Sequence, residues 1–128
     1  MTAIDESPLA TALPARPLDG WVEVCAVDRL IPDRGVAALV DGHQVAAFRL
    51  ADGALHAIDN VDPCSGAAVL SRGIIGDAGG RTTVASPLHK QRFDLATGAC
   101  LDADVPPLDV HEIAVVHGIV FIRLRPAP

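Results

Sequence analysis

The sequence contains no tyrosine, and only four of its 128 residues are aromatic: Trp21, Phe48, Phe93 and Phe121. Half of the residues are nevertheless hydrophobic, so the core must be built mainly from aliphatic side chains. A chain of this length is expected to form one domain rather than two. A domain of this size can bury enough apolar surface to fold without disulfides or a structural metal.

Cysteine is also scarce. Cys25, Cys64 and Cys100 lie far apart and form no Cys-x-x-Cys pair. A sparse, odd number of cysteines in a chain without a secretion signal indicates reduced thiols and a cytoplasmic protein. Cys25 and Cys100 occur in strand-like segments, so the simplest interpretation is that both are core residues.

Long apolar segments and an excess of positive charge are missing too. No segment approaches the ~20 uncharged apolar residues of a membrane-spanning helix. The N-terminal residues include Asp5 and Glu6 and lack the cationic start of a signal peptide. The formal net charge of −6 disfavours nucleic acid as a partner. We therefore expect neither a membrane nor a nucleic-acid partner.

Two regions differ in composition. Residues 1–20 are rich in alanine, proline and threonine, which predicts a mobile N-terminal extension. From Trp21 onward, short apolar segments alternate with turn residues, which places the domain at 21–128. One helical turn is expected at 28–32, where a proline ends it. The strands that this pattern predicts span 21–25, 35–40, 44–50, 54–58, 81–85, 91–95, 112–116 and 119–124.

Turn residues connect these predicted strands. Asp41-Gly42-His43 and His117-Gly118 each predict a β-hairpin. The glycines between 73 and 80 predict a flexible loop; they match neither a dinucleotide-binding nor a phosphate-binding motif. No serine has the surroundings of a hydrolase nucleophile. The fold class predicted from these elements is all-β, a sandwich or small barrel, and the chain offers no catalytic or cofactor-binding residues of its own.

The segment 86–98 (SPLHKQRFDLATG) resembles the second cluster-binding loop of a Rieske iron–sulfur domain, Cys-Pro-x-His-Gly-x-x-Phe-Asp-x-x-Thr-Gly. The resemblance puts Ser86 at the cysteine position and His89 at the histidine position. Aligning Leu70-Ser71-Arg72-Gly73 with the end of the first loop puts Pro63 at its cysteine and Ser65 at its histidine. A Rieske centre needs two cysteines and two histidines. The resemblance therefore implies a Rieske-like fold, with two loops at an exposed tip and no metal cluster.

Within the Rieske-like proteins, the chain resembles the small subunit of bacterial assimilatory NAD(P)H-dependent nitrite reductase. The specific match is residues 85–93 (ASPLHKQRF), and residues 70–73, 21–25 and 120–124 extend it over nearly the whole domain. The family implies a non-catalytic, cytoplasmic subunit of a holoenzyme that reduces nitrite to ammonium. It also implies a large subunit as the partner, with FAD, an iron–sulfur cluster and sirohaem all on that subunit. We expect the isolated chain to be inactive.

Other interpretations of the tip remain open. His89 is a metal ligand, an acid or base, a redox-tuning group, or an ordinary loop histidine. Cys64 and Asp62 offer, together with His89, a mononuclear metal site. The remaining histidines are interpreted as surface or hydrogen-bonded polar groups: His43, His56, His111 and His117. At the level of function, the alternative is a freestanding Rieske-like adaptor or electron-transfer protein for another oxidoreductase, and electron transfer requires the missing ligands.

Basic residues cluster around the two loop motifs. Arg72, Lys90 and Arg92 flank them in a chain that is acidic overall. Because Rieske loops form an exposed tip, we expect these charges to dock the tip on an acidic surface of the large subunit. The alternative is that they are solvated surface charges with no partner.

Overall fold

The computed structural model describes residues 20–125, so the extension predicted over 1–20 lies outside the described residues except for Gly20. The described chain forms two antiparallel sheets. The larger sheet has the order β1 (Trp21–Ala26), β9 (Ile119–Arg123), β8 (Val110–Val116), β4 (Leu55–Asp59), β3 (His43–Arg49) and β2 (Gly35–Val40). The smaller sheet contains β5 (Ile74–Ala78), β6 (Arg81–Ala85) and β7 (Arg92–Asp94).

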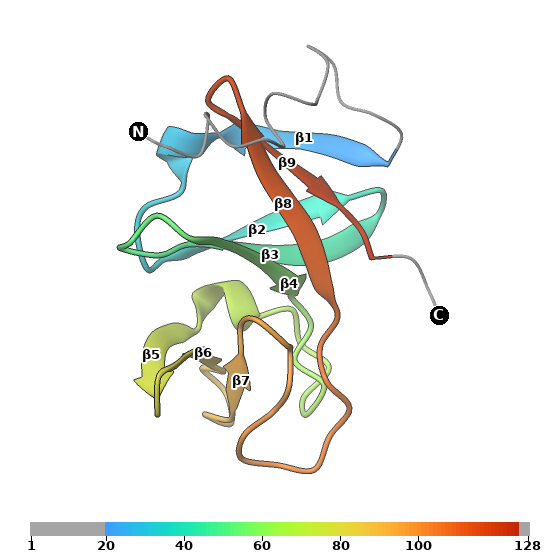
Figure 1. The fold of residues 1–128 in the computed structure, drawn as a ribbon. Coiled ribbons are helices and arrows are strands. Elements are labelled where there is room, and N and C mark those ends of the chain that lie inside the picture. Colours follow the sequence, from blue (N-terminus) through green and yellow to red (C-terminus); the bar gives the residue numbers. More distant parts are fainter. Residues whose placement is uncertain (1–19, 126–128) are drawn as a thin grey trace.

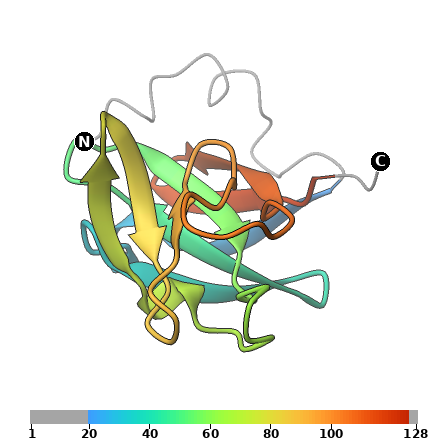
Figure 2. The same cartoon turned by 90° about the horizontal axis from the view of Figure 1, so that it is seen from below.

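The larger sheet curls until its edge strands β1 and β2 touch, which makes it a nearly closed barrel. The smaller sheet lies below it in Figure 1, and Figure 2 looks at the molecule from that side. The chain also contains two short 3-10 turns: η2 (Val27–Arg29) directly follows β1, and η3 (Leu70–Arg72) directly precedes β5. The all-β prediction is confirmed. No helix in the described part of the chain is long and apolar enough to cross a bilayer.

Both predicted hairpins form. Asp41 and Gly42 have φ angles of 50° and 80°, and His117 and Gly118 have 51° and 79°. Positive φ at both central residues is the signature of a type I′ turn, whose twist matches that of the strands it joins. The first turn therefore consists of two residues, and His43 belongs to β3 rather than to the turn.

The prediction of a flexible glycine loop after residue 73 is wrong. Residues 74–78 form β5, which pairs with β6 from Ile74↔Ala85 to Ala78↔Arg81. Gly79 and Gly80 make the turn between them, with φ angles of 61° and 88°. The strand has a glycine, an aspartate and an isoleucine that is 73% exposed, so its own sequence carries little strand signal. The pairing with β6 determines its conformation.

Strand β3 is covered on both faces. Val45 and Ala47 point into the core inside the curled sheet, whereas Ala46 and Phe48 point into a second core between the two sheets. Successive strand residues face opposite sides, so four consecutive buried residues require cover on both faces. Cys25 is partly buried against the first core and Cys100 against the second. Both cysteines were predicted to be core residues, and both lie at the edge of a core.

The second core holds the tip segments in place. Leu70 of η3 and Phe93 of β7 are fully buried in it beside Phe48. The first loop, residues 60–69, runs from β4 to η3, and the second, residues 86–91, connects β6 to β7. Because each loop ends at a residue or element anchored in the same core, both loops emerge at the same end of the domain.

We expect Gly98→Ala to destabilise the protein more than Gly42→Ala does. Both glycines have φ near +80°, so each alanine carries a strain of about 1–3 kcal/mol. A β-carbon at Gly98 would also lie 2.0 Å from the carbonyl oxygen of Leu108, while nothing lies within 4 Å of one at Gly42. Equilibrium urea unfolding measures both losses, and equal losses would contradict the close contact.

Candidate functional site

The four positions that correspond to Rieske ligands lie in the two loops, in contrasting environments. Pro63, Ser65 and His89 are exposed, whereas Ser86 is 1% exposed. The loops lie side by side beside the small sheet, as Figure 2 shows, and a hydrogen bond joins them. All four residues therefore lie in the two loops, and three of them are exposed to solvent.

A buried carboxylate links the loops. Asp62, which is 0% exposed, accepts a hydrogen bond of 2.6 Å from the hydroxyl of Ser86. Its other oxygen accepts the Cys64 amide at 2.8 Å. The Asp62 carbonyl also accepts the amide of Gly66 at 2.7 Å, which closes a tight turn. Asp62 thus organises the first loop and binds the second loop at Ser86, the residue predicted to match a Rieske cysteine.

The second loop is a closed turn around Ser86. The Ser86 amide donates to the Gln91 carbonyl, and the Lys90 amide donates to the Ser86 carbonyl, both at 2.9 Å. The Leu88 amide reaches the Ser86 hydroxyl at 3.3 Å. Lys90 has a φ of 64°, which places it in the left-handed region at the position where Rieske loops have glycine.

The electrostatics of the tip favour the ionised form of Asp62 and the neutral thiol of Cys64. Burial alone would raise the pKa of Asp62, but hydrogen bonds from Ser86 and the Cys64 amide, with the charge of His89, lower it below its ordinary value. Desolvation and the charge of Asp62 raise the pKa of the Cys64 thiol. The thiolate is the form that binds metals, so Cys64 is a poor ligand here.

These donors do not fit a Rieske cluster. The four positions supply one imidazole and no thiolate, whereas the cluster needs two of each. The mononuclear alternative also fails geometrically. Among residues 20–125, one group of three or more histidine, cysteine or acidic side chains brings its donor atoms within 4.8 Å, and it does not include Asp62, Cys64 or His89.

The three basic residues proposed for docking differ in their surroundings. Arg92 binds Asp102 through two nitrogens, at 2.8 and 3.0 Å, and this pairing lowers the pKa of Asp102 to about 2. Arg72 and Lys90 are exposed and make no ion pair within the part of the chain described. Arg92 is therefore largely neutralised, while Arg72 and Lys90 present their charge to solvent.

Sequence reasoning missed a cluster on the large sheet. Nε2 of His43 and Nε2 of His111 both lie against Oδ1 of Asp59, at 2.7 and 2.8 Å. Both histidines were expected to be surface or hydrogen-bonded groups, and hydrogen bonding is what the structure shows. Period-two alternation puts His111 and Asp59 on the buried side of their strands, but the pairing of distant strands was needed to bring the three together.

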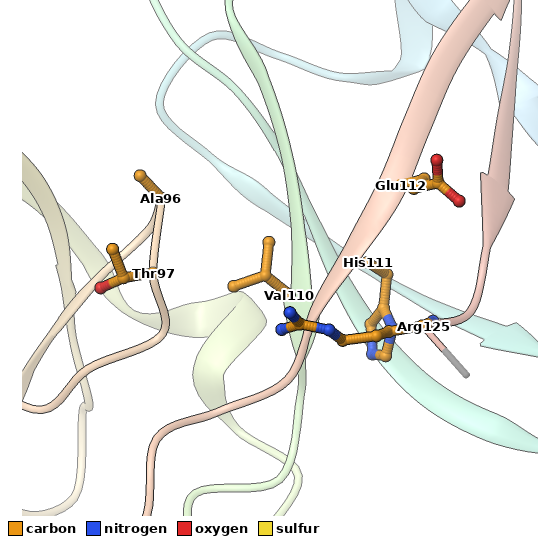
Figure 3. Close-up of a pocket in the computed structure, with 6 residues that line it drawn as sticks. All are labelled: Ala96, Thr97, Val110, His111, Glu112 and Arg125. Carbon is orange, nitrogen blue, oxygen red and sulfur yellow. The ribbon is translucent and has the colours of Figure 1, made fainter. Parts of the chain in front are cut away.

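A depression with a volume of about 600 Å³ opens beside the same histidine. Figure 3 shows His111 and Arg125 on one side, with Ala96 and Thr97 of the turn after β7 on the other. It lies away from the four ligand-equivalent positions, none of which lines it.

Comparisons with known proteins agree with this fold. Residues 20–123 match the family model for a Rieske-like [2Fe-2S] domain. The nitrite reductase (NADH) small subunit of Escherichia coli K12 is 40% identical over 104 residues, which cover 80% of this chain and 96% of that protein. A crystal structure described as an NADH-dependent nitrite reductase small subunit from Mycobacterium tuberculosis is 52% identical, with a TM-score of 0.78, covering 84% of this chain and 96% of that one.

A further relative is a much longer protein. The nitrite reductase [NAD(P)H] large subunit of Klebsiella oxytoca is 40% identical over 111 residues, which cover 87% of this chain but 11% of that protein. One segment of that large subunit is therefore similar to the domain described above. Since the matches span the domain almost from end to end, the chain belongs to the Rieske-like [2Fe-2S] domain family and, within it, to the small subunits of NADH-dependent nitrite reductase.

Proposed function

We propose that this chain is the non-catalytic small subunit of an NADH-dependent assimilatory nitrite reductase, which reduces nitrite to ammonium, and that it binds the large subunit. The Klebsiella oxytoca protein carries this proposal, because a segment similar to this chain occurs there within a polypeptide named as the large subunit. Two proteins that function together are often joined in one chain elsewhere, so the segment supports a physical association between the two subunits.

We further propose that this chain carries no redox centre, and that the FAD, the iron–sulfur cluster and the sirohaem all reside on the large subunit. The donor set supports this: a proline and two serines stand where three of the four ligands belong. We place the protein in the cytoplasm, where NADH is available and where its three free cysteines remain reduced.

We expect the isolated chain to be folded and colourless. With one histidine at four ligand positions, it has no means of holding a [2Fe–2S] cluster. Visible absorption, iron and sulfide analysis, and paramagnetic resonance after reduction measure this directly. Stoichiometric iron and sulfide with a Rieske-type signal would instead favour the electron-transfer alternative. Loss of NADH-linked nitrite reduction on removing the chain from the holoenzyme is the matching test of the subunit role.

In the tip, we propose that a hydrogen bond takes over the structural role of a cluster. A cluster ligated from two loops cross-links them. Here the bond from Ser86 to the buried Asp62 connects the same loops. A hydrogen bond to a charged group contributes about 1.5–3 kcal/mol, which is enough to hold two short loops together. The tip can therefore keep its shape without metal.

We expect Ser86→Ala to cost about 1–3 kcal/mol of unfolding free energy, because it leaves the buried Asp62 carboxylate and the Leu88 amide each short of a partner. Ser65→Ala is the comparison variant; that hydroxyl is exposed, accepts the Ala67 amide at 3.2 Å and acts only weakly on Asp62, so its loss should be smaller than that of Ser86→Ala. Urea unfolding of Ser86→Ala, of Asp62→Asn and of the variant that combines them gives the coupling free energy between the two residues. Additive losses would contradict the link.

The same link predicts a pH dependence. The pKa of Asp62 is lowered in the folded protein, so its stabilising effect is complete above its ordinary value of 3.8 and is lost as the pH falls through the lower, folded value. The stability difference between the natural protein and Asp62→Asn should therefore be constant at neutral pH and shrink below pH 3.8. A difference that persists in acid would mean that the carboxylate charge is not involved.

The tip is also the surface that we propose docks on the large subunit. Two apolar side chains are exposed there, Val61 (39%) in the first loop and Leu88 (53%) in the second. Lys90 adds positive charge in the second loop, and Arg72 adds it in η3, which directly follows the first loop. Exposed apolar residues surrounded by unpaired charge have the composition of a protein interface. Arg92 contributes less, because Asp102 already compensates its charge.

We expect Lys90→Glu and Arg72→Glu each to weaken binding to the purified large subunit about tenfold at low salt, with a smaller effect at high salt. Arg29→Glu makes the same charge change in η2, at the other end of the domain, and should leave binding unchanged. Surface plasmon resonance measures the association rates, and thermal melts verify folding. Normal binding by both tip variants would move the interface to another face.

A further inference from the structure

Three potential metal ligands meet at one end of the core inside the large sheet. His43 begins β3, Asp59 ends β4, and His111 lies in β8. Val45 pairs with Asp59, and Ala57 pairs with His111. Because side chains two residues apart share a face, this register puts the two histidines and the aspartate on the same side of three adjacent strands. Their positions are thus determined by sheet pairing rather than by loop conformation.

The local geometry brings three donor atoms together. Nε2 of both histidines and Oδ1 of Asp59 all lie within 4.8 Å of one another. The His111 side chain is 2% exposed and that of His43 is 47% exposed. The cluster therefore has a fixed, buried histidine at its base and a movable, solvent-facing histidine at its mouth, where an ion can enter from water.

We propose that His43, Asp59 and His111 bind a divalent first-row transition ion such as Zn²⁺. Two imidazoles and one carboxylate are a donor set that favours such ions over Mg²⁺ or Ca²⁺, which prefer oxygen. Zinc bonds of about 2.0–2.1 Å in a tetrahedral site put the ligand atoms roughly 3.3 Å apart. The two N···O distances, 2.7 and 2.8 Å, need to widen by about half an ångström. Movement of the exposed His43 widens the first, and a turn of the partly exposed Asp59 carboxylate widens the second.

The charge of the site is suited to a cation. Burial alone would raise the pKa of Asp59, but hydrogen bonds from His43 and His111 outweigh burial and lower it, so the carboxylate is ionised at neutral pH. The carboxylate supplies one negative charge to the cluster, in a chain that is already acidic. A divalent ion would replace the hydrogen bonds that now hold the three side chains, and water would complete its coordination.

Binding requires one proton to move. The Nδ1 atom of His111 accepts the backbone amide of Arg125 at 2.9 Å, so the ring proton lies on Nε2 and points at Asp59. Figure 3 shows the two residues side by side. If Nε2 binds the metal, the proton moves to Nδ1 and two N–H groups face each other. The Arg125 amide must then turn away, so metal binding should be coupled to release of this hydrogen bond.

The test is a titration of the full-length, untagged chain, stripped with EDTA, with Co²⁺ and then with Zn²⁺ in competition. We expect one Co²⁺ ion per chain, with visible d–d bands and no thiolate-to-cobalt band, and displacement by Zn²⁺. His43→Gln, which changes an exposed residue, should weaken binding beyond the roughly 10–100-fold that changes to outer-shell groups cause. His117→Gln, at an exposed hairpin turn, is the matched control and should bind normally.

An independent measurement is the amide signal of Arg125 in nuclear magnetic resonance spectra. In the natural chain, Zn²⁺ should shift this signal and speed its hydrogen exchange, and His43→Gln should abolish both effects at the same Zn²⁺ concentration. Three results would overturn the proposal: no one-to-one binding at millimolar Co²⁺, equal binding by His43→Gln and His117→Gln, or a thiolate band that disappears in Cys64→Ser. The last would place the metal at the tip.

Discussion

The arrangement of the molecule depends on one constraint: β3 is buried on both faces. Val45 and Ala47 close the core inside the curled sheet, and Ala46 and Phe48 form the floor on which the small sheet packs. Four adjacent buried residues cannot shift register without exchanging the two sets of side chains. The position of the small sheet, and of both loops that it anchors, is therefore tied to the register of a single strand. With few aromatic residues available, Phe48 and Phe93 supply much of the contact between the sheets.

In our proposal, the tip has exchanged a metal cluster for a hydrogen bond as the cross-link between its two loops. The Rieske-like family joins two loops through metal ligands, whereas here a buried carboxylate and a serine hydroxyl lie 2.6 Å apart between the same loops. The hydrogen bond is much weaker than metal ligation, but the loops need little more, because Leu70 and Phe93 hold their ends in the core. An electron-transfer tip that loses its ligands can keep its shape in this way, and with it a surface for protein contacts.

Electrostatics divide the surface into regions with different roles. The chain is acidic overall, yet the two loops expose Val61, Leu88 and Lys90, and η3, directly after the first loop, exposes Arg72. On the large sheet, Asp59 draws two histidines together and keeps its negative charge despite partial burial. Positive charge thus lies where a partner protein is proposed, and negative charge where a cation is proposed. The two sites use different residues, so each can be changed without touching the other.

The strands, the two hairpins and the family were predictable from sequence, because period-two alternation, positive-φ turn residues and the motif at residues 85–93 are all local signals. Strand β5 was not, since its conformation comes from pairing with β6. Local sequence also could not show that Arg92 is paired with Asp102, or that Asp62 joins the two loops through Ser86. By itself, the sequence determined which donor types stand at the four predicted ligand positions, because a donor type is a property of a residue. Only the tertiary structure decided which side chains meet, because the meeting of His43, Asp59 and His111 depends on strand pairing that brings together Asp59 and His111, 52 residues apart in the chain.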